Sequence, residues 1–135
     1  MTQPEASPPS APEPGPGGDL EKETRTWACI LHLSVLAGLV IAFAGLVAPL
    51  IIYLIKRDEL PGLEPHSKVV FNWIISAIIY FFVGLALTIT LVGAVVGVPI
   101  MFVVAVLSII FPIIGGIKAS SGELWPYPLS IPILK

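Results

Sequence analysis

Charged residues are scarce in this sequence of 135 residues, and their scarcity excludes most classes of soluble protein. Asp, Glu, Lys and Arg together make up 12% of the chain, whereas soluble domains average about 25%. They are absent from Trp27 to Ile55, a run of 29 residues, and from Val69 to Ile117, a run of 49 residues. Charge-free apolar runs longer than ~18 residues are typical of membrane spans. We therefore expect an integral membrane protein.

Cysteine and basic residues are also few. Cys29 is the only cysteine, which excludes an intrachain disulfide and a CxxC site. The formal net charge is −2, and a nucleic-acid-binding protein would need a basic patch instead. The sequence contains no metal-ligand spacing, no Ser/His/Asp set and no phosphate-binding glycine loop. We expect no enzyme activity, no metal, no cofactor and no nucleic-acid partner.

Residues 1–26 are rich in proline, glycine and acidic residues. Six of the first 18 residues are proline and three are glycine, and five of the nine acidic residues precede residue 27. Such a composition buries too little apolar surface to offset the entropy lost on ordering. We predict a disordered tail over residues 1–26, followed by one helical membrane domain over residues 27–135.

The first apolar run, residues 27–55, is too long for one straight span. As a helix it would measure about 43 Å, whereas the hydrocarbon core is ~30 Å thick. Pro49 removes a helical donor and leaves the carbonyl of Gly45 without a partner, which predicts a break near Ala42–Gly45. Two arrangements remain open. Either an interfacial stretch leads into one full span that ends at Ile55, or two half-helices form a re-entrant hairpin.

The second apolar run must contain two spans, because 49 helical residues would extend about 73 Å. We predict transmembrane helices at about 69–90 and 98–117. Gly93 and Gly97 mark the turn between them, although their spacing also suits close helix packing. Pro112 should kink the last span. The expected fold is therefore a small all-α membrane bundle with two full spans and a broken or re-entrant segment.

The basic residues predict the sidedness. Five of the seven lie in the loop 56–68 or after the last span. By the positive-inside rule, this loop and the C-terminus are cytoplasmic in a multi-pass protein of the plasma (inner) membrane. Lys22 and Arg25 join that side if the first run is a re-entrant hairpin, and lie outside if it crosses once. The charge count favours the hairpin.

Polar side chains within the apolar runs are the main candidates for function. Asn72, Ser76 and Tyr80 follow one another at steps of four and share one helix face within about 80°. Because lipid solvates such groups poorly, this face should look into the bundle. Hydrogen bonds between helices are one interpretation, and a polar path for a solute or a peptide segment is the other. His32 and Ser34 are further candidates, since a histidine titrates near neutral pH.

Charged and aromatic residues outside the runs add a second group. The loop offers Asp58, Glu64, His66 and Lys68, either as an acid/base pair or as a salt-bridged cap over the helix ends. The C-terminal residues include Trp125 and three prolines, which exclude a continuous helix. Aromatic residues suit the headgroup layer, so we expect this segment along the cytoplasmic interface.

From His32 to its end, the chain resembles a small bacterial membrane family called domain of unknown function four-eight-seven-zero. It is similar, more distantly, to the chloroplast import component Tic-twenty. The matching pieces are HLS (His32–Ser34), APLIIYLIKRD (Ala48–Asp58), PHSKVVFNWIIS (Pro65–Ser76), FPIIGGIKASSGE (Phe111–Glu123) and YPL (Tyr127–Leu129).

The resemblance implies a helical membrane module without an established activity. The chain departs from the family at Leu63–Lys68, where members usually carry a second acidic residue. It departs again at Ala42–Gly45, where members often have a break with proline and asparagine. These departures weaken a role for a second loop acid and the re-entrant interpretation.

A membrane enzyme with His32 or His66 as its base is disfavoured, because the sequence has no metal-ligand spacing, Ser/His/Asp set or phosphate-binding glycine loop. Two functions remain. The first is a non-enzymatic scaffold or assembly component in the lipid bilayer, which acts by helix–helix association with copies of itself or with other membrane proteins. The alternative is a subunit of a transport or protein-translocation complex, with Asn72, Ser76 and Tyr80 along the path.

Overall fold

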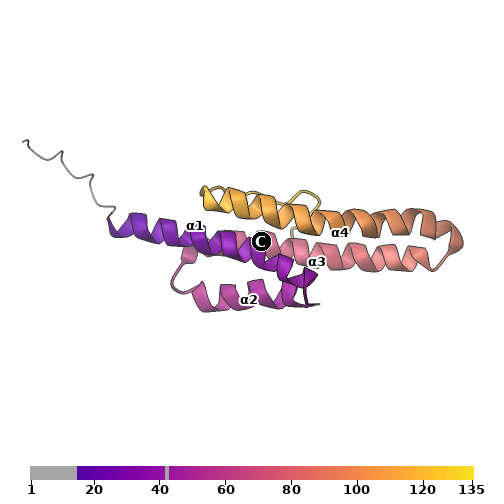
Figure 1. The fold of residues 1–135 in the computed structure, drawn as a ribbon, viewed down its shortest axis with the longest axis horizontal. Coiled ribbons are helices and arrows are strands. Elements are labelled where there is room, and N and C mark those ends of the chain that lie inside the picture. The colour runs from indigo at the N-terminus through magenta and orange to yellow at the C-terminus, as the bar shows by residue number, and fades with distance from the viewer. Residues whose placement is uncertain (1–14, 42) are drawn as a thin grey trace, which may run out of the picture.

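The computed structural model describes residues 15–41 and 43–135 (Figure 1). Within these ranges the chain is helical and contains no β-strand, which confirms the predicted all-α architecture. The disorder predicted for residues 1–14, and Ala42 at the predicted break, lie outside the described residues. The elements follow in the order α1 (Pro16–Ser34), the 3₁₀ turn η1 (Val35–Leu39), α2 (Ala44–Lys56), the 3₁₀ turn η2 (Pro61–Leu63), α3 (Glu64–Thr88) and α4 (Leu91–Ser120).

The longest helices, α3 and α4, form an antiparallel hairpin in which the two helices lie side by side (Figure 1). They contain 25 and 30 residues, and both are long and apolar enough to cross a membrane. Two full spans were predicted at about 69–90 and 98–117. The structure confirms two such helices and extends them to Glu64 and Ser120.

The turn of this hairpin lies earlier than the glycines indicated. The chain turns at Ile89 and Thr90, whose hydroxyl accepts a hydrogen bond of 3.0 Å from the amide of Gly93 and so caps α4. Gly93 and Gly97 are therefore helical. Apolar surroundings tolerate glycine within a helix, and here it permits contact, because a Cβ at Gly97 would lie 2.5 Å from the carbonyl oxygen of Gly84.

The first apolar run folds back on itself and does not cross the full length of the hairpin. α1 ends at η1, the chain reverses, and α2 returns alongside α1 (Figure 1). At the open end, the Nζ of Lys56 lies 3.9 Å from a carboxylate oxygen of Glu23. At the closed end, a Cβ at Gly45 would lie 2.6 Å from the carbonyl oxygen of Val35. The first run is therefore a helical hairpin of α1 and α2, which is the shape that the predicted re-entrant arrangement requires.

The helical path of the first run is interrupted close to the predicted place, and neither Pro49 nor Pro112 ends its helix. The kink expected at Pro112 stays a prediction. The helical path is interrupted before Ala44, whereas Pro49 lies within α2 and is fully buried. Gly45 therefore allows the tip to close and does not itself interrupt the helix. Pro112 likewise lies inside α4 and is fully buried. Both rings fill space against neighbouring elements in an environment where proline is tolerated within helices.

Part of the predicted tail is helical, because α1 begins at Pro16 and not at Trp27. A proline in the first helical turn has a suitable φ and loses no hydrogen bond there. Asp19 in the same turn interacts favourably with the helix dipole. Composition alone suggested disorder up to residue 26, and it overlooked these two features of a helix start.

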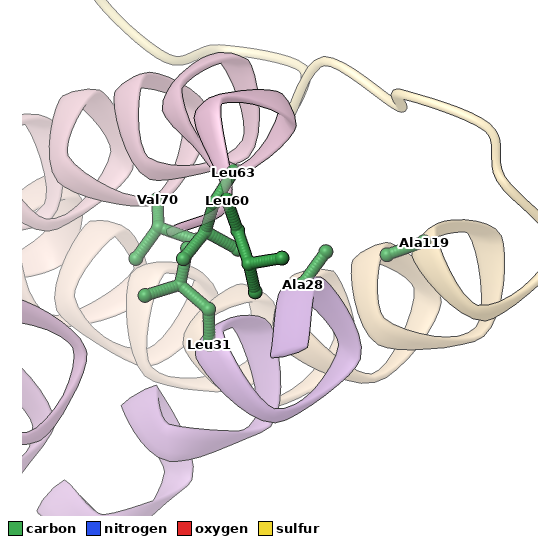
Figure 2. Packing of buried hydrophobic residues seen from close by; sticks show 6 residues of the cluster. All are labelled: Ala28, Leu31, Leu60, Leu63, Val70 and Ala119. Carbon is green, nitrogen blue, oxygen red and sulfur yellow. The ribbon is translucent and has the colours of Figure 1, made fainter. Parts of the chain in front are cut away.

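The apolar core joins the α1–α2 hairpin to α3 and α4. In Figure 2 the side chains of Leu31, Leu60, Leu63 and Val70 point toward one another between α1, η2 and α3. Ala28 and Ala119 complete this cluster, and all six residues are at most 1% exposed. The cluster lies near the open end of the hairpins and so brings the polar residues of α1 and α3 into register.

A Gly97→Ala substitution should destabilise the contact between α3 and α4. The added methyl group would meet the backbone of Gly84, which cannot move as a flexible side chain can, and overpacking typically costs about 1–3 kcal/mol. We expect a lower midpoint of thermal unfolding, which circular dichroism in detergent micelles would measure. Gly17→Ala is the matched control, because a Cβ there meets nothing within 4 Å. Equal midpoints for both variants would contradict the close approach.

Candidate functional site

The polar face of α3 binds the C-terminal segment of the chain, residues 121–135. This segment is not helical and runs back along α3 after α4 ends. The side-chain amide of Asn72 donates to the carbonyl oxygen of Leu134 at 3.0 Å. Its side-chain oxygen accepts from the amide of Leu134 at 2.6 Å. One asparagine thus pairs with both polar backbone groups of one residue.

Ser76 and Tyr80 continue this pairing along the same face. The amide of Ile131 donates to the Ser76 hydroxyl at 2.7 Å, and that hydroxyl donates to the carbonyl of its own helix at Asn72. The Tyr80 hydroxyl donates to the carbonyl oxygen of Leu129 at 2.7 Å. The stripe of Asn72, Ser76 and Tyr80 is therefore a ladder of side-chain partners for an irregular backbone.

Such a ladder is required wherever non-helical backbone enters an apolar environment. An unpaired amide or carbonyl group costs several kcal/mol in hydrocarbon, and the C-terminal segment cannot pair its own groups as a helix does. The C-terminal segment packs against α3, where the polar stripe supplies hydrogen bonds to its backbone. Its expected place along the cytoplasmic interface stays a prediction.

A second polar cluster links α1, α3 and the C-terminal segment. The Nδ1 of His32 on α1 lies 2.6 Å from the hydroxyl of Tyr127, and its Nε2 lies 3.1 Å from the Nδ1 of His66 on α3. All three side chains are buried. Gly115 of α4 leaves room for them, because a Cβ there would lie 2.6 Å from the Nδ1 of His32.

The cluster forms a continuous hydrogen-bonded chain from Tyr127 through His32 to His66. A histidine ring and a tyrosine hydroxyl can each donate and accept, so this chain can be ordered with its protons in either direction.

Aromatic rings of α3 and α4 also contact the C-terminal segment. The ring of Tyr127 lies 5.4 Å from that of Phe111 on α4 and 6.2 Å from that of Trp73 on α3, measured between centroids. Trp125 packs against Phe111 at 5.6 Å. The segment is thus anchored by ring contacts at one end and by backbone pairing at the other.

The structure brings some predicted residues together and leaves others apart. His32 and His66, which the sequence placed in separate groups, are in direct contact. Ser34 instead donates to the carbonyl oxygen of Leu31 within its own helix. Tyr127 was missed as a site residue, although the prolines around it already indicated a segment that needs outside hydrogen-bond partners.

The loop acids and bases form surface pairs. Glu64 and Lys68 pair at 2.7 Å one helical turn apart, and Asp58 lies 3.6 Å from the Nε of its neighbour Arg57. His66 turns away from these charges toward His32. Within residues 15–41 and 43–135, no three His, Cys, Asp or Glu side chains gather in a group that could hold a metal ion.

The comparisons with known proteins identify a family. Residues 23–134 match the model of the magnetosome magnetite crystal formation protein family, MamF/MmsF. This match covers most of the chain, which therefore belongs to that family. No curated protein and no solved structure matches the chain significantly.

This match corrects the resemblance drawn from the sequence. The assignment to domain of unknown function four-eight-seven-zero, with its likeness to Tic-twenty, is wrong, because the matching family is a different one. The pieces quoted for it, such as HLS at His32–Ser34 and YPL at Tyr127–Leu129, contribute to the two polar clusters. Short motifs of this kind serve local packing and hydrogen bonding and discriminate poorly between membrane families.

Replacing Asn72 by leucine should release the end of the C-terminal segment. The variant loses two hydrogen bonds to Leu134, which together contribute about 1 kcal/mol in a membrane protein. The probe is a cysteine introduced by Ile131→Cys in a Cys29→Ala background. We expect maleimide to label this cysteine several-fold faster in the Asn72→Leu variant than in the protein that keeps Asn72. Ile79→Leu, at an exposed position of the same helix, is the control. An unchanged labelling rate would show that the ladder does not hold the segment.

Proposed function

We propose that this member of the magnetosome magnetite crystal formation family takes part in forming magnetite crystals as a non-enzymatic integral membrane component. It would act by association with further copies of the chain or with other membrane proteins. The observation that carries this proposal is the family match over residues 23–134. Two helices with the length and composition of spans, α3 and α4, support the membrane setting.

The use of the polar side chains supports a structural role. Asn72, Ser76 and Tyr80 bond to the C-terminal segment, and His32 bonds to Tyr127 and His66. A catalytic group needs a free face toward a substrate, whereas these groups hold one part of the fold to another. The same contacts occupy the face that a transport path would need. We therefore do not propose a subunit of a transport or protein-translocation complex.

The apolar surface supports association. Near the tip of the re-entrant hairpin, α3 and α4 line an apolar cavity of about 610 Å³, with Ala77, Met101 and Ser108 among its lining residues. Helices associate in membranes through close packing, because lipid and side chains are equally apolar. A side chain from a neighbouring helix that enters this cavity would gain packing contacts that mobile lipid chains supply less well.

The placement of the basic residues supports one orientation. Because the first run is a hairpin, Arg25 and Lys56 lie at the same end of the molecule as Lys68 and Lys118. By the positive-inside rule this end is cytoplasmic, and the turn at Thr90 faces the opposite compartment. The loop 56–68 and the end of α4 would then lie on the cytoplasmic side of the membrane.

A deletion experiment in a magnetite-forming bacterium that carries this gene tests the proposal. We expect cells without the protein to form crystals of altered size in electron micrographs, and the wild-type gene to restore them. The Ile79→Leu variant should restore them equally, because it keeps every polar contact. Chemical cross-linking in isolated membranes should trap the protein with a neighbour.

Two results would contradict the proposal. Crystals of unchanged size in cells shown to lack the protein would remove the role in crystal formation. A strict monomer without cross-linked partners, in cells whose crystals are restored, would remove the role of association.

A further inference from the structure

The two halves of the α3–α4 hairpin differ in how much protein surrounds them. In Figure 1 the α1–α2 hairpin and the C-terminal segment lie alongside the half that contains the start of α3 and the end of α4. The half that contains the turn at Thr90 has only α3 and α4. The first is called the broad half below, and the second the narrow half.

Side-chain contacts show how deep the added segments reach. The deepest hydrogen bond of the C-terminal segment joins Leu129 to Tyr80, which stands 16 residues after the first residue of α3, about 24 Å along the helix. On the other side, Phe43 at the tip of the re-entrant hairpin lines one cavity together with Phe81 and Phe82. Counted from Val69, where the charge-free run begins, Tyr80 lies roughly 16 Å into a hydrocarbon core ~30 Å thick. Both added segments would therefore end at the same level, near the middle of the bilayer.

Two glycines explain why the narrow half is thin. Gly84 and Gly97 bring the two helices into backbone contact, since a Cβ at Gly97 would overlap the carbonyl of Gly84. Around this contact the side chains point outward, with Leu91 91% exposed and Val95 76% exposed. In the broad half, by contrast, Trp73 of α3 and Phe111 of α4 are buried.

The two halves differ in membrane cross-section by about the area of two helices. A helix body about 10 Å across occupies roughly 80 Å² of membrane area, so α1 and α2 add roughly 160 Å² to the broad half, before the C-terminal segment is counted. A bilayer that accommodates more area in one leaflet than in the other is relieved by bending so that the crowded leaflet lies on the convex face.

We propose that the chain is a molecular wedge whose preferred partner is a curved lipid surface, convex on the side of the loop 57–60 and the end of α4. The proposal rests on the membrane placement given under the proposed function. It adds that the re-entrant hairpin and the C-terminal segment set the curvature, because both fill one leaflet only. A flat bilayer would leave lipid packing in the narrow half under strain.

Reconstituted vesicles test this directly. The full chain, labelled with a fluorophore at its N-terminus, is incorporated into vesicles of phosphatidylcholine and phosphatidylglycerol with a broad range of sizes. Protein density per lipid area is then measured vesicle by vesicle. We expect a density at least about twofold higher on vesicles ~50 nm across than on vesicles ~400 nm across. A Glu59→Cys label in a Cys29→Ala background should react from outside on the small vesicles.

A truncated chain that ends at Gly122 supplies the second measurement. It lacks most of the C-terminal segment, so its preference for small vesicles should be weaker than that of the full chain, while Ile79→Leu should leave the preference unchanged. If the truncated chain does not insert, the wild-type curve of density against diameter still decides the question. A preference undiminished by truncation would overturn the part assigned to the C-terminal segment.

A density independent of diameter would overturn the wedge, as would Glu59 facing the interior of the small vesicles. These failures differ from failure of the proposed function. If the protein density does not depend on vesicle diameter but the protein still restores magnetite crystals, only the wedge proposal is refuted. If the protein prefers small vesicles but its loss leaves the crystals unchanged, only the proposed function is refuted.

Discussion

The fold depends on one constraint, which is that irregular backbone can enter an apolar environment only where each polar group finds a partner. The C-terminal segment breaks helical pairing because it contains three prolines. α3 compensates with Asn72, Ser76 and Tyr80, placed one helical turn apart. The spacing of that stripe matches the backbone groups of residues 129–134, and α3 thereby acts as the template on which the end of the chain is folded.

The histidine cluster extends the same constraint to the first hairpin. His32 contributes its two ring nitrogens to two different segments, Tyr127 on one side and His66 on the other. A buried polar group is costly unless it is paired, so α1, α3 and the C-terminal segment are correctly placed only together. Gly115 makes this junction possible, because a larger residue would occupy the space of the imidazole.

Much of the architecture could be predicted from the sequence, because the absence of charge over long runs has few physical solutions. Two spans followed from the length of the second run, and the fold-back of the first run was one of two arrangements that its length allowed. The turn was misplaced because Gly93 and Gly97 serve helix contact as well as turns. Glycine in a membrane sequence does not by itself distinguish these roles.

The candidate site was predicted only in part. The polar face of α3 followed from helical periodicity, but its partner, a segment 49 to 62 residues away in sequence, could not be inferred from any local pattern. The contact between His32 and His66 was missed for the same reason, since it depends on the packing of α1 against α3. Family membership was misjudged because short motifs record local packing, whereas the match to the magnetosome family extends over residues 23–134.

In the proposed topology, the first apolar run and the C-terminal segment enter the membrane from the same face and return to it. Single-cysteine accessibility from the two sides of a sealed membrane tests this topology, with probes at Lys22, Glu59, Thr90 and Glu123 in a Cys29→Ala background. We predict that Lys22, Glu59 and Glu123 react from one side and Thr90 from the other. Reaction of Lys22 and Glu59 from opposite sides would show a full crossing and contradict it.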